Sequence, residues 1–277
     1  MTVITQNNHF SHIKSIVLKV MIMALLTSPL FVKAESVSLG YFTLAPHIFQ
    51  DKDGNAVGPL PEFLNKHIGP AMGVTFKLVN MPLARILKEM ERGELPGGAL
   101  FGCTQDRTVT YNYPVHSFYS MQPVIAVLKS SPLDEISLPA NLKKLSIGYV
   151  TDAIISLYMK NNQIEFLNLS GNNTWQRNVK MLLEGRLDAV YSPAEINMMH
   201  AANNVNVLDK IKIIRLPEAP IKLYSLFSND KAFDKLNLAT KYDKAFKQVN
   251  GAHVYKSLLS HWEGKLISEK IFKSKVE

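Results

Sequence analysis

The sequence has 277 residues, of which 47% are hydrophobic and 19% are charged, as in an ordinary globular protein. Its formal net charge of +8 comes from scattered basic residues. No basic helix or aromatic-basic stripe occurs, so nucleic-acid binding is not expected. The single cysteine, Cys103, excludes an internal disulfide. A chain of this length forms a core without one.

The first 34 residues are predicted to be a secretory signal peptide that takes no part in the fold. His12, Lys14 and Lys19 lie in a charged lead, an apolar run follows, and Val32-Lys33-Ala34 resembles a cleavage site. The uninterrupted apolar stretch is shorter than the roughly 20 residues of a membrane span, so a membrane anchor is the less favoured interpretation. The signal peptide predicts that the mature protein is exported. No later apolar run is long enough to span a membrane, so the mature protein is expected to be soluble.

The mature chain opens with a pattern of alternating strands and helices, read from the periodicity of its apolar residues. The predicted elements in chain order are a strand at 36–40, a helix at 60–68, a strand at 74–78, a helix that Pro82 opens and Gly93 stops, and a strand at 99–101. This β-α-β-α-β order predicts a parallel sheet with helices on its faces.

The same pattern recurs further along the chain. Its predicted elements are a strand at 145–150, a helix at 154–159 capped by Thr151 or Asp152, a strand at 164–169, a helix at 175–183 that stops at Gly185, and a strand at 188–191. Ser192-Pro193-Ala194-Glu195 then resembles a capping box with proline at the first helical position. The recurrence predicts two α/β lobes of like topology.

Two extended apolar segments, 122–128 and 223–227, are predicted to cross between the lobes and to form a hinge. The tail from Lys231 to Trp262 is expected to be helical, broken at Gly251, and packed back on the first lobe. The predicted organisation is a signal peptide at 1–34, lobe 1 at 35–124 and 223–277, and lobe 2 at 125–222.

Four phrases, in their order and spacing, carry a resemblance to a known family. They are Asp53-Gly54 with Gly58-Pro59-Leu60-Pro61-Glu62-Phe63, Thr104-Gln105-Asp106-Arg107, Gly185-Arg186-Leu187-Asp188-Ala189, and the run from Lys247 through Gly251 to Trp262. The sequence thereby resembles the extracellular solute-binding proteins of family 3, the periplasmic, polar amino-acid-type receptors of ABC importers. The resemblance implies a two-lobed clamp of type II, each lobe a mostly parallel sheet flanked by helices, with ligand held between the lobes.

The resemblance also implies the setting in which the protein works. The protein would be a monomer in the periplasm of a Gram-negative bacterium, and its partners would be the membrane subunits of an ABC transporter. Neither a cofactor nor a metal is expected, because the histidines lack metal-ligand spacing within one helix.

Arg107 is the first candidate for ligand binding. A guanidinium offers a planar fork that grips a carboxylate through two parallel hydrogen bonds. Arg107 follows the strand at 99–101, at the end of the strand where open α/β sheets bind ligands. In the family, the arginine at this position binds the carboxylate of the ligand, and Thr104 would support it. The alternative is a surface arginine in a loop.

Further candidates in lobe 1 are Arg85, Tyr41, Phe42 and His47. Arg85 lies in the first turn of its helix, where it either faces the ligand or is simply solvated. The other three follow the first strand and are suited to form a wall against which a ligand packs. Core packing is the alternative for these residues, and a surface loop for His47.

The lobe 2 candidates, Thr151 and Asp152, depart from the family pattern. The family usually has glycine with serine or threonine there, so that backbone N–H groups bind the carboxylate. Asp152 would repel an anion unless it only caps the helix. Amino-acid binders also carry an acid where this chain has Pro193, so Glu195 or Asp152 would have to replace it. The expected ligand is a small polar, amino-acid-like solute with one anionic group, and a standard α-amino acid is in doubt.

Two other functions stay open. The first is a periplasmic sensor subunit, which would need a separate signalling partner. The second is a dehydratase-type enzyme on the same fold, for which only Asp106, Asp152 and Glu195 are available as acids, and no pair stands out. Asp188 is expected to buttress its strand. Cys103 has no histidine near it in sequence and is expected to be a buried small hydrophobe rather than a nucleophile. Binding without chemistry is therefore preferred.

Overall fold

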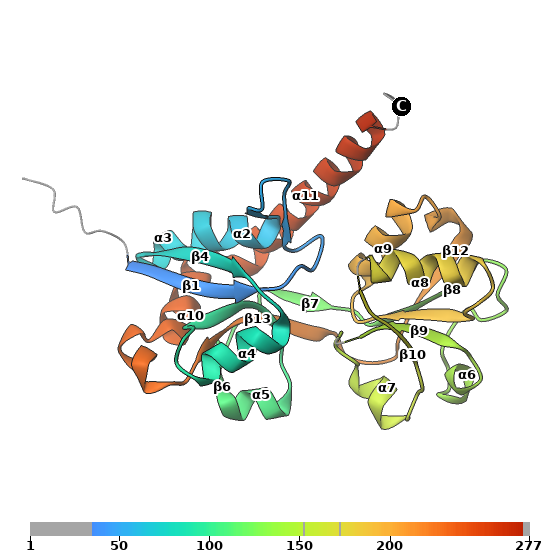
Figure 1. Cartoon of the computed structure of the whole chain (residues 1–277), viewed down its shortest axis with the longest axis horizontal. Coiled ribbons are helices and arrows are strands. Elements are labelled where there is room, and N and C mark those ends of the chain that lie inside the picture. Colours follow the sequence, from blue (N-terminus) through green and yellow to red (C-terminus); the bar gives the residue numbers. More distant parts are fainter. Residues whose placement is uncertain (1–34, 152, 172, 274–277) are drawn as a thin grey trace, which may run out of the picture. The chain divides into compact units, whose positions relative to one another are not determined.

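The computed structural model describes residues 35–151, 153–171 and 173–273, with only the backbone given for 105–106 and 266–273. The predicted signal peptide and Asp152 lie outside the described residues. Residues 35–277 form one compact unit. It contains two mixed sheets and a short two-stranded hairpin (Figure 1).

The first sheet has the strand order β4-β1-β5-β13-β6, and β7 also pairs with β13. Strands β4, β1 and β5 are parallel, whereas β13 runs antiparallel to its neighbours. The strands are β1 (Glu35–Tyr41), β4 (Val74–Asn80), β5 (Gly97–Gly102), β6 (Tyr111–Asn112), β7 (Tyr119–Met121) and β13 (Ile221–Ser228), and the hairpin is β2 (Phe49–Gln50) with β3 (Ala56–Val57). All six residues of β5 are buried, as expected for a central strand covered on both faces.

Helices cover this sheet and enclose its core, in which Leu39, Phe63 and Tyr242 are fully or almost fully buried. They are α2 (Pro59–Phe63), the π-helical η1 (Leu64–Ile68), α3 (Gly69–Met72), α4 (Leu83–Glu91), α5 (Gln105–Thr110), the 3-10 helix η3 (Lys231–Leu236), α10 (Leu238–Gln248) and α11 (Gly251–Lys273). The β-α-β-α-β order predicted for this half is confirmed. Pro82 is the N-cap of α4 rather than its first helical residue.

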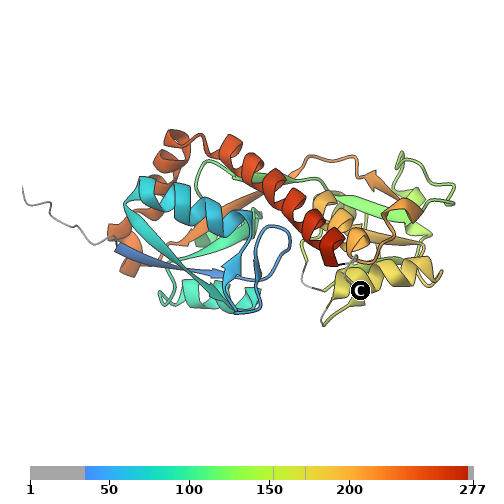
Figure 2. The same cartoon turned by 90° about the horizontal axis from the view of Figure 1, so that it is seen from above.

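The C-terminal helix packs on the first sheet's helices, as predicted. Trp262 Nε1 donates a hydrogen bond of 2.9 Å to Glu62 Oε2 of α2, and α11 lies beside α2 (Figures 1 and 2). Gly251 was expected to break the helical tail, but it is the first residue of α11. The turn is instead at Asn250, whose φ is 53°. A Cβ on Gly251 would lie 2.4 Å from the Phe246 ring, which explains the glycine.

The second sheet has the strand order β10-β9-β11-β8-β12. Strands β10, β9 and β11 are parallel, and β8 runs antiparallel to both β11 and β12. The elements are β8 (Val124–Leu128), α6 (Ala140–Lys143), β9 (Ile147–Val150), α7 (Leu157–Asn161), β10 (Leu167–Leu169), α8 (Thr174–Leu183), β11 (Ala189–Ser192), α9 (Glu195–Asn204), the 3-10 helix η2 (Leu208–Lys210) and β12 (Ile211–Arg215). In each sheet the three parallel strands have the order second-first-third, beside an antiparallel fourth strand. The prediction of like topology is therefore confirmed.

Two local predictions for this half were wrong. The helix expected at 154–159 begins only at Leu157, because Ser156 is its N-cap and its Oγ accepts the N–H of Met159 at 3.3 Å. The expected capping box is also absent. Ser192 Oγ donates to the carbonyl of Ala194 at 2.8 Å instead of capping a helix, and α9 starts at Glu195.

The first crossing between the sheets is only the start of the predicted segment 122–128, and the second precedes the predicted segment 223–227. Most of 122–128 and all of 223–227 are buried strands, because such apolar runs are more stable inside a sheet than in a link. The crossings are Gln122–Pro123 and residues 216–220. They are tied together, since Gln122 Nε2 donates to the carbonyl of Leu216 at 3.2 Å and the Leu216 N–H donates to the carbonyl of Pro123 at 2.9 Å.

Among the described residues, no helix is both long and apolar enough to span a membrane.

Candidate functional site

A small pocket of about 60 Å³ lies where strands of both sheets end. It is lined from the first sheet and its helices by Phe42, Leu44, Leu83, Leu100, Phe101, Gly102, Arg107, Met121 and Leu223, and from the second by Ala153, Ile154, Trp175 and Pro193. Phe42 follows β1, Gly102 ends β5, Ile154 follows β9 and Pro193 follows β11. The carboxyl ends of parallel strands from both sheets thus meet at one place, which is where open α/β sheets bind ligands.

Arg107 is the only charged side chain among the described residues that line this pocket. It lies in α5, the short helix that follows β5. Its Nη1 donates to the carbonyl of Gly102 at 3.2 Å, and its guanidinium carbon lies 5.7 Å from the centre of the Phe101 ring. These contacts hold the guanidinium in place through one hydrogen bond and a cation–π interaction. None of the ion pairs between described side chains involves Arg107.

Two neighbours complete the surroundings of the guanidinium. The Tyr113 hydroxyl donates to the carbonyl of Gly102 at 3.0 Å, and burial raises the pKa of this phenol, so it stays protonated. Cys103 is exposed, which corrects the expectation that it is buried. Partial desolvation outweighs the nearby Arg107 and raises the pKa of the thiol. A thiol that stays protonated is a poor nucleophile.

The wall from the second sheet is a loop that hydrogen bonds fix. The Tyr191 hydroxyl donates to the carbonyl of Ile154 at 2.9 Å and accepts the N–H of Ser156 at 3.0 Å. The Tyr149 hydroxyl donates to the carbonyl of Ala153. Ile154 packs directly against Gly102, since a Cβ added to that glycine would lie 2.4 Å from Ile154 Cδ1. This contact closes one side of the pocket.

Of the predicted lobe 1 candidates, Phe42 and Arg107 line the pocket and four others do not. Tyr41 is buried in the core of the first sheet. Arg85 is an exposed residue of α4 that pairs with Glu89 at 2.6 Å, as a solvated helix residue does. Thr104 is the half-buried N-cap residue of α5, without a side-chain capping bond.

His47 is fully buried and belongs to the core rather than to a surface loop. Its Nδ1 lies 2.7 Å from the hydroxyl oxygen of Tyr255 on α11, and its ring lies 4.7 Å from the ring of Tyr119. Its other nitrogen, Nε2, is buried without a hydrogen-bond partner among the described residues. Burial lowers the pKa of His47 to about 3, so the ring is neutral at physiological pH.

In the second sheet, Thr151 is exposed, and its Oγ1 donates to the carbonyl of Leu169 at 3.2 Å. Asp152 lies outside the described residues, and the side chain of Asp106 is not described either. Glu195 is held by Arg215, whose Nη2 and Nε lie 2.7 and 2.9 Å from Glu195 Oε2.

Asp188 accepts hydrogen bonds from the N–H and hydroxyl of Ser146, at 2.8 and 2.7 Å, which lower the pKa of its carboxyl. It therefore buttresses the start of β11, as predicted. No group of three histidine, cysteine, aspartate or glutamate residues in the described ranges is arranged to hold a metal ion.

The sequence analysis did not select most of the apolar lining. Leu83, Ile154 and Trp175 were assigned only to helices, although each lies within a few residues of a strand's carboxyl end or a helix start. Their position after parallel strands was the signal that could have identified them.

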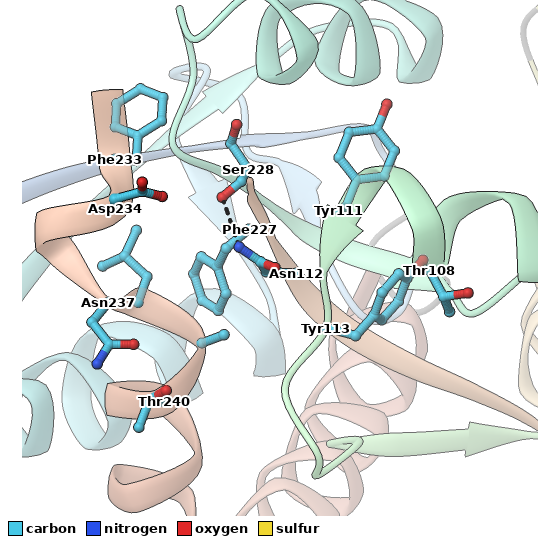
Figure 3. A pocket seen from close by; sticks show the side chains of 12 residues that line it. Thr108, Tyr111, Asn112, Tyr113, Phe227, Ser228, Phe233, Asp234, Asn237 and Thr240 are labelled. Carbon is cyan, nitrogen blue, oxygen red and sulfur yellow. Dashed lines mark hydrogen bonds between the residues drawn. The ribbon is translucent and has the colours of Figure 1, made fainter. Parts of the chain in front are cut away.

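A larger hollow, of about 460 Å³, lies elsewhere on the first sheet (Figure 3). It extends from Thr108 and Tyr113 to Ser228, at the end of β13 that pairs with the start of β5. Two of its polar side chains are engaged within the protein. Asn112 Nδ2 donates to the carbonyl of Ser228 at 3.3 Å, and the Tyr111 hydroxyl donates to Glu91 at 2.7 Å. The Arg107 pocket is the better candidate site because it lies at the carboxyl ends of parallel strands from both sheets.

No family model matches the sequence, and no curated protein sequence matches it. Solved structures do match. A double mutant of the BvgS VFT2 domain from Bordetella pertussis is 15% identical with a TM-score of 0.65, covering 82% of this chain and 93% of that chain. A histidine kinase sensor domain with similarity to periplasmic binding proteins is also 15% identical, with a TM-score of 0.65 and coverages of 82% and 95%. The arginine-, lysine-, histidine-binding protein ArtJ from Geobacillus stearothermophilus is 21% identical, with a TM-score of 0.61 and coverages of 83% and 96%.

These similarities establish the fold. The chain has the two-lobed α/β architecture of periplasmic binding proteins and of the periplasmic sensor domains built on the same plan. The predicted fold class is confirmed, and the resemblance to amino-acid-type solute-binding proteins is confirmed at the level of the fold.

Proposed function

We propose that this chain is a periplasmic solute-binding protein. It holds a small carboxylate-bearing, amino-acid-like solute in the Arg107 pocket without changing it, and presents it to the membrane subunits of an ABC importer. In this proposal residues 1–34 direct export. The two lobes correspond to the two sheets, so the boundaries predicted at 35–124 with 223–277 and at 125–222 move to the crossings at Gln122–Pro123 and residues 216–220. The ligand bridges the lobes, so that contacts made only in the closed state favour closure.

One observation carries the proposal: a guanidinium free of any described acid faces an apolar pocket at the carboxyl ends of two sheets. Small-molecule pockets are mostly apolar, with a few polar groups that fix the ligand's orientation. A carboxylate satisfies a guanidinium best because it accepts two parallel hydrogen bonds. The two crossings, joined through Gln122 and Leu216, are narrow enough to serve as a hinge.

A sensor role is the second candidate, because a histidine kinase sensor domain is among the similar structures. The pocket would work in the same way, but the closed protein would bind a signalling partner in place of a transporter. An enzyme is less well supported. Among the described residues, Glu195 and Asp188 are engaged by Arg215 and Ser146 and do not line the pocket.

The first test is a thermal-shift screen of the purified protein against amino acids, amines and small carboxylates. A ligand at 100 times its dissociation constant stabilises the protein by about 2.7 kcal/mol. At about 2–4 °C per kcal/mol for a protein of this size, the melting temperature rises by several degrees.

The shift should disappear in Arg107→Ala and persist in the matched control Arg85→Ala, whose side chain is 66% exposed and outside the pocket. A ligand whose shift survives Arg107→Ala would contradict the assigned site. Unchanged ligand recovered after incubation supports binding, whereas turnover would favour the enzyme.

A further inference from the structure

No described acidic side chain lines the Arg107 pocket, so no described carboxylate there can pair with an ammonium. Apart from Arg107, every described residue that lines it is apolar or glycine. The sequence analysis offered two acids as ammonium partners. Glu195 already binds Arg215 through two nitrogens and does not line the pocket, and Asp152 lies outside the described residues.

Three backbone carbonyls around the pocket already accept hydrogen bonds. The carbonyl oxygen of Gly102 accepts hydrogen bonds from both Arg107 and Tyr113, which fill its two lone pairs. The carbonyl of Ile154 accepts from Tyr191, and that of Leu223 accepts the N–H of Phe118 at 3.1 Å. An ammonium in this pocket would therefore lie close to a guanidinium without a carboxylate partner among the described lining residues. Burying a charge without a partner is strongly unfavourable.

A carboxylate, in contrast, has hydrogen-bond donors available in this pocket. Arginine has five N–H donors, more than its contacts with Gly102 and Tyr113 use. The cation–π contact with Phe101 fixes its plane, so that little side-chain entropy is lost when an anion binds.

The size of the pocket limits the rest of the ligand. Ile154 against Gly102 closes one side, and Trp175 lines the pocket from α8. A compact, branched or short apolar group fits such walls better than an extended polar chain.

We infer that the ligand is a small apolar monocarboxylate that lacks an ammonium group. This inference rests on the proposed function and narrows it, since it removes the ordinary α-amino acids from the amino-acid-like solutes.

The test uses sets of compounds that differ by one charged group. Valine, 3-methylbutanoate and 2-methylpropylamine share the branched 2-methylpropyl group. Valine carries both charges, 3-methylbutanoate carries only the anion, and 2-methylpropylamine carries only the cation. Alanine with propanoate, and phenylalanine with 3-phenylpropanoate, repeat the comparison at a smaller and a larger size. Affinities are measured by isothermal titration calorimetry on the purified protein and on Arg107→Ala.

We expect the carboxylate of at least one set to bind at least tenfold more tightly than its amino acid, the amine not to bind, and Arg107→Ala to abolish binding. An amino acid that binds more tightly than its carboxylate, still dependent on Arg107, would overturn this inference and leave the proposed function intact. Failure of every carboxylate and amino acid to show Arg107-dependent binding would overturn both.

Two opposite substitutions at the Ile154–Gly102 contact test the size limit. Ile154→Val removes the Cδ1 atom that lies against Gly102, whereas Gly102→Ala adds a methyl group at the same point. The ratio of affinities for 4-methylpentanoate and 3-methylbutanoate should rise at least threefold in the first variant and fall in the second. Leu157→Val, at a position that is 71% exposed, is the control. An unchanged ratio in both variants would show that this contact does not bound the ligand.

Discussion

His47 should make the protein measurably less stable in mild acid. The ring is fully buried, and burial lowers its pKa from 6.5 to about 3. The unfolded chain therefore binds a proton on His47 below pH 6.5, whereas the folded protein does not until about pH 3. Stability from this group is complete above pH 6.5 and is lost progressively as the pH falls from 6.5 to 3.

The expected magnitude follows from that range. Each pH unit below 6.5 lowers the free energy of unfolding by about 1.4 kcal/mol. At pH 5 the contribution is therefore about 2 kcal/mol, which corresponds to roughly 4–8 °C in melting temperature for a protein of this size. The groups that face the ring are Tyr119 and Tyr255, whose phenols burial keeps protonated in this range, so they do not offset the effect.

Urea unfolding at pH 7.5 and pH 5 measures this effect in the parent protein, His47→Leu and His253→Gln. His47→Leu removes the titrating ring and should lose about 2 kcal/mol less between the two pH values than the parent, although Tyr255 loses a partner and overall stability falls. His253 is exposed on the same helix as Tyr255, so its variant should behave like the parent. Equal losses in the parent and His47→Leu would refute the reasoning.

Three further predictions concern sites outside the pocket. Gly58→Ala should lower the free energy of unfolding in urea by about 1–3 kcal/mol, because the φ of Gly58 is 126° and a Cβ would lie 2.6 Å from the carbonyl oxygen of His47. Gly73→Ala should lower it less, because Gly73 has a φ of 71° and open space around it. The reverse order would contradict this explanation. Asp188→Asn should lower the free energy of unfolding at pH 7 by about 0.5–1.5 kcal/mol. The difference should shrink as the pH falls below 3.8, because the Ser146 bonds lower the pKa of this carboxyl; a difference that is constant with pH would count against the role of the charge. Cys103 should react with a thiol reagent in the native protein, because it is exposed, but slowly, because the pKa of its thiol is raised. A reaction only after unfolding would show that Cys103 is not exposed in the native protein.

The alternation of strands and helices was predictable because it depends on local sequence. Apolar periodicity and glycine stops located β1, β4 and β5, and again β9, β10 and β11, to within a few residues. The stops at Gly93 and Gly185 held because positive φ, here 69° and 68°, is a requirement of the backbone itself. Periodicity failed at 154–159, where Ile154 is apolar because it faces the pocket and Gly102, not because it belongs to a helix.

Candidate site residues were harder to predict than elements. Tyr41 and Phe42 follow one strand in sequence, but the former points into the core and the latter lines the pocket, since successive residues of a strand face opposite ways. The sequence alone did not show which of the two side chains would point toward the ligand. The sequence also did not show whether Arg85 faces the ligand or solvent. In the structure Arg85 forms an ion pair with Glu89 on the exposed face of α4.

The sequence by itself determined two sheets of like topology and the placement of Arg107 after a buried strand, because both follow from neighbours along the chain. Only the tertiary structure decided the chemistry of the pocket. Glu195 is engaged by Arg215, Gly102 has its carbonyl filled by Arg107 and Tyr113, and Ile154 limits the space. Apart from Arg107 and Tyr113 with Gly102, these contacts join residues far apart in sequence, and no periodicity or spacing encodes which pairs will meet.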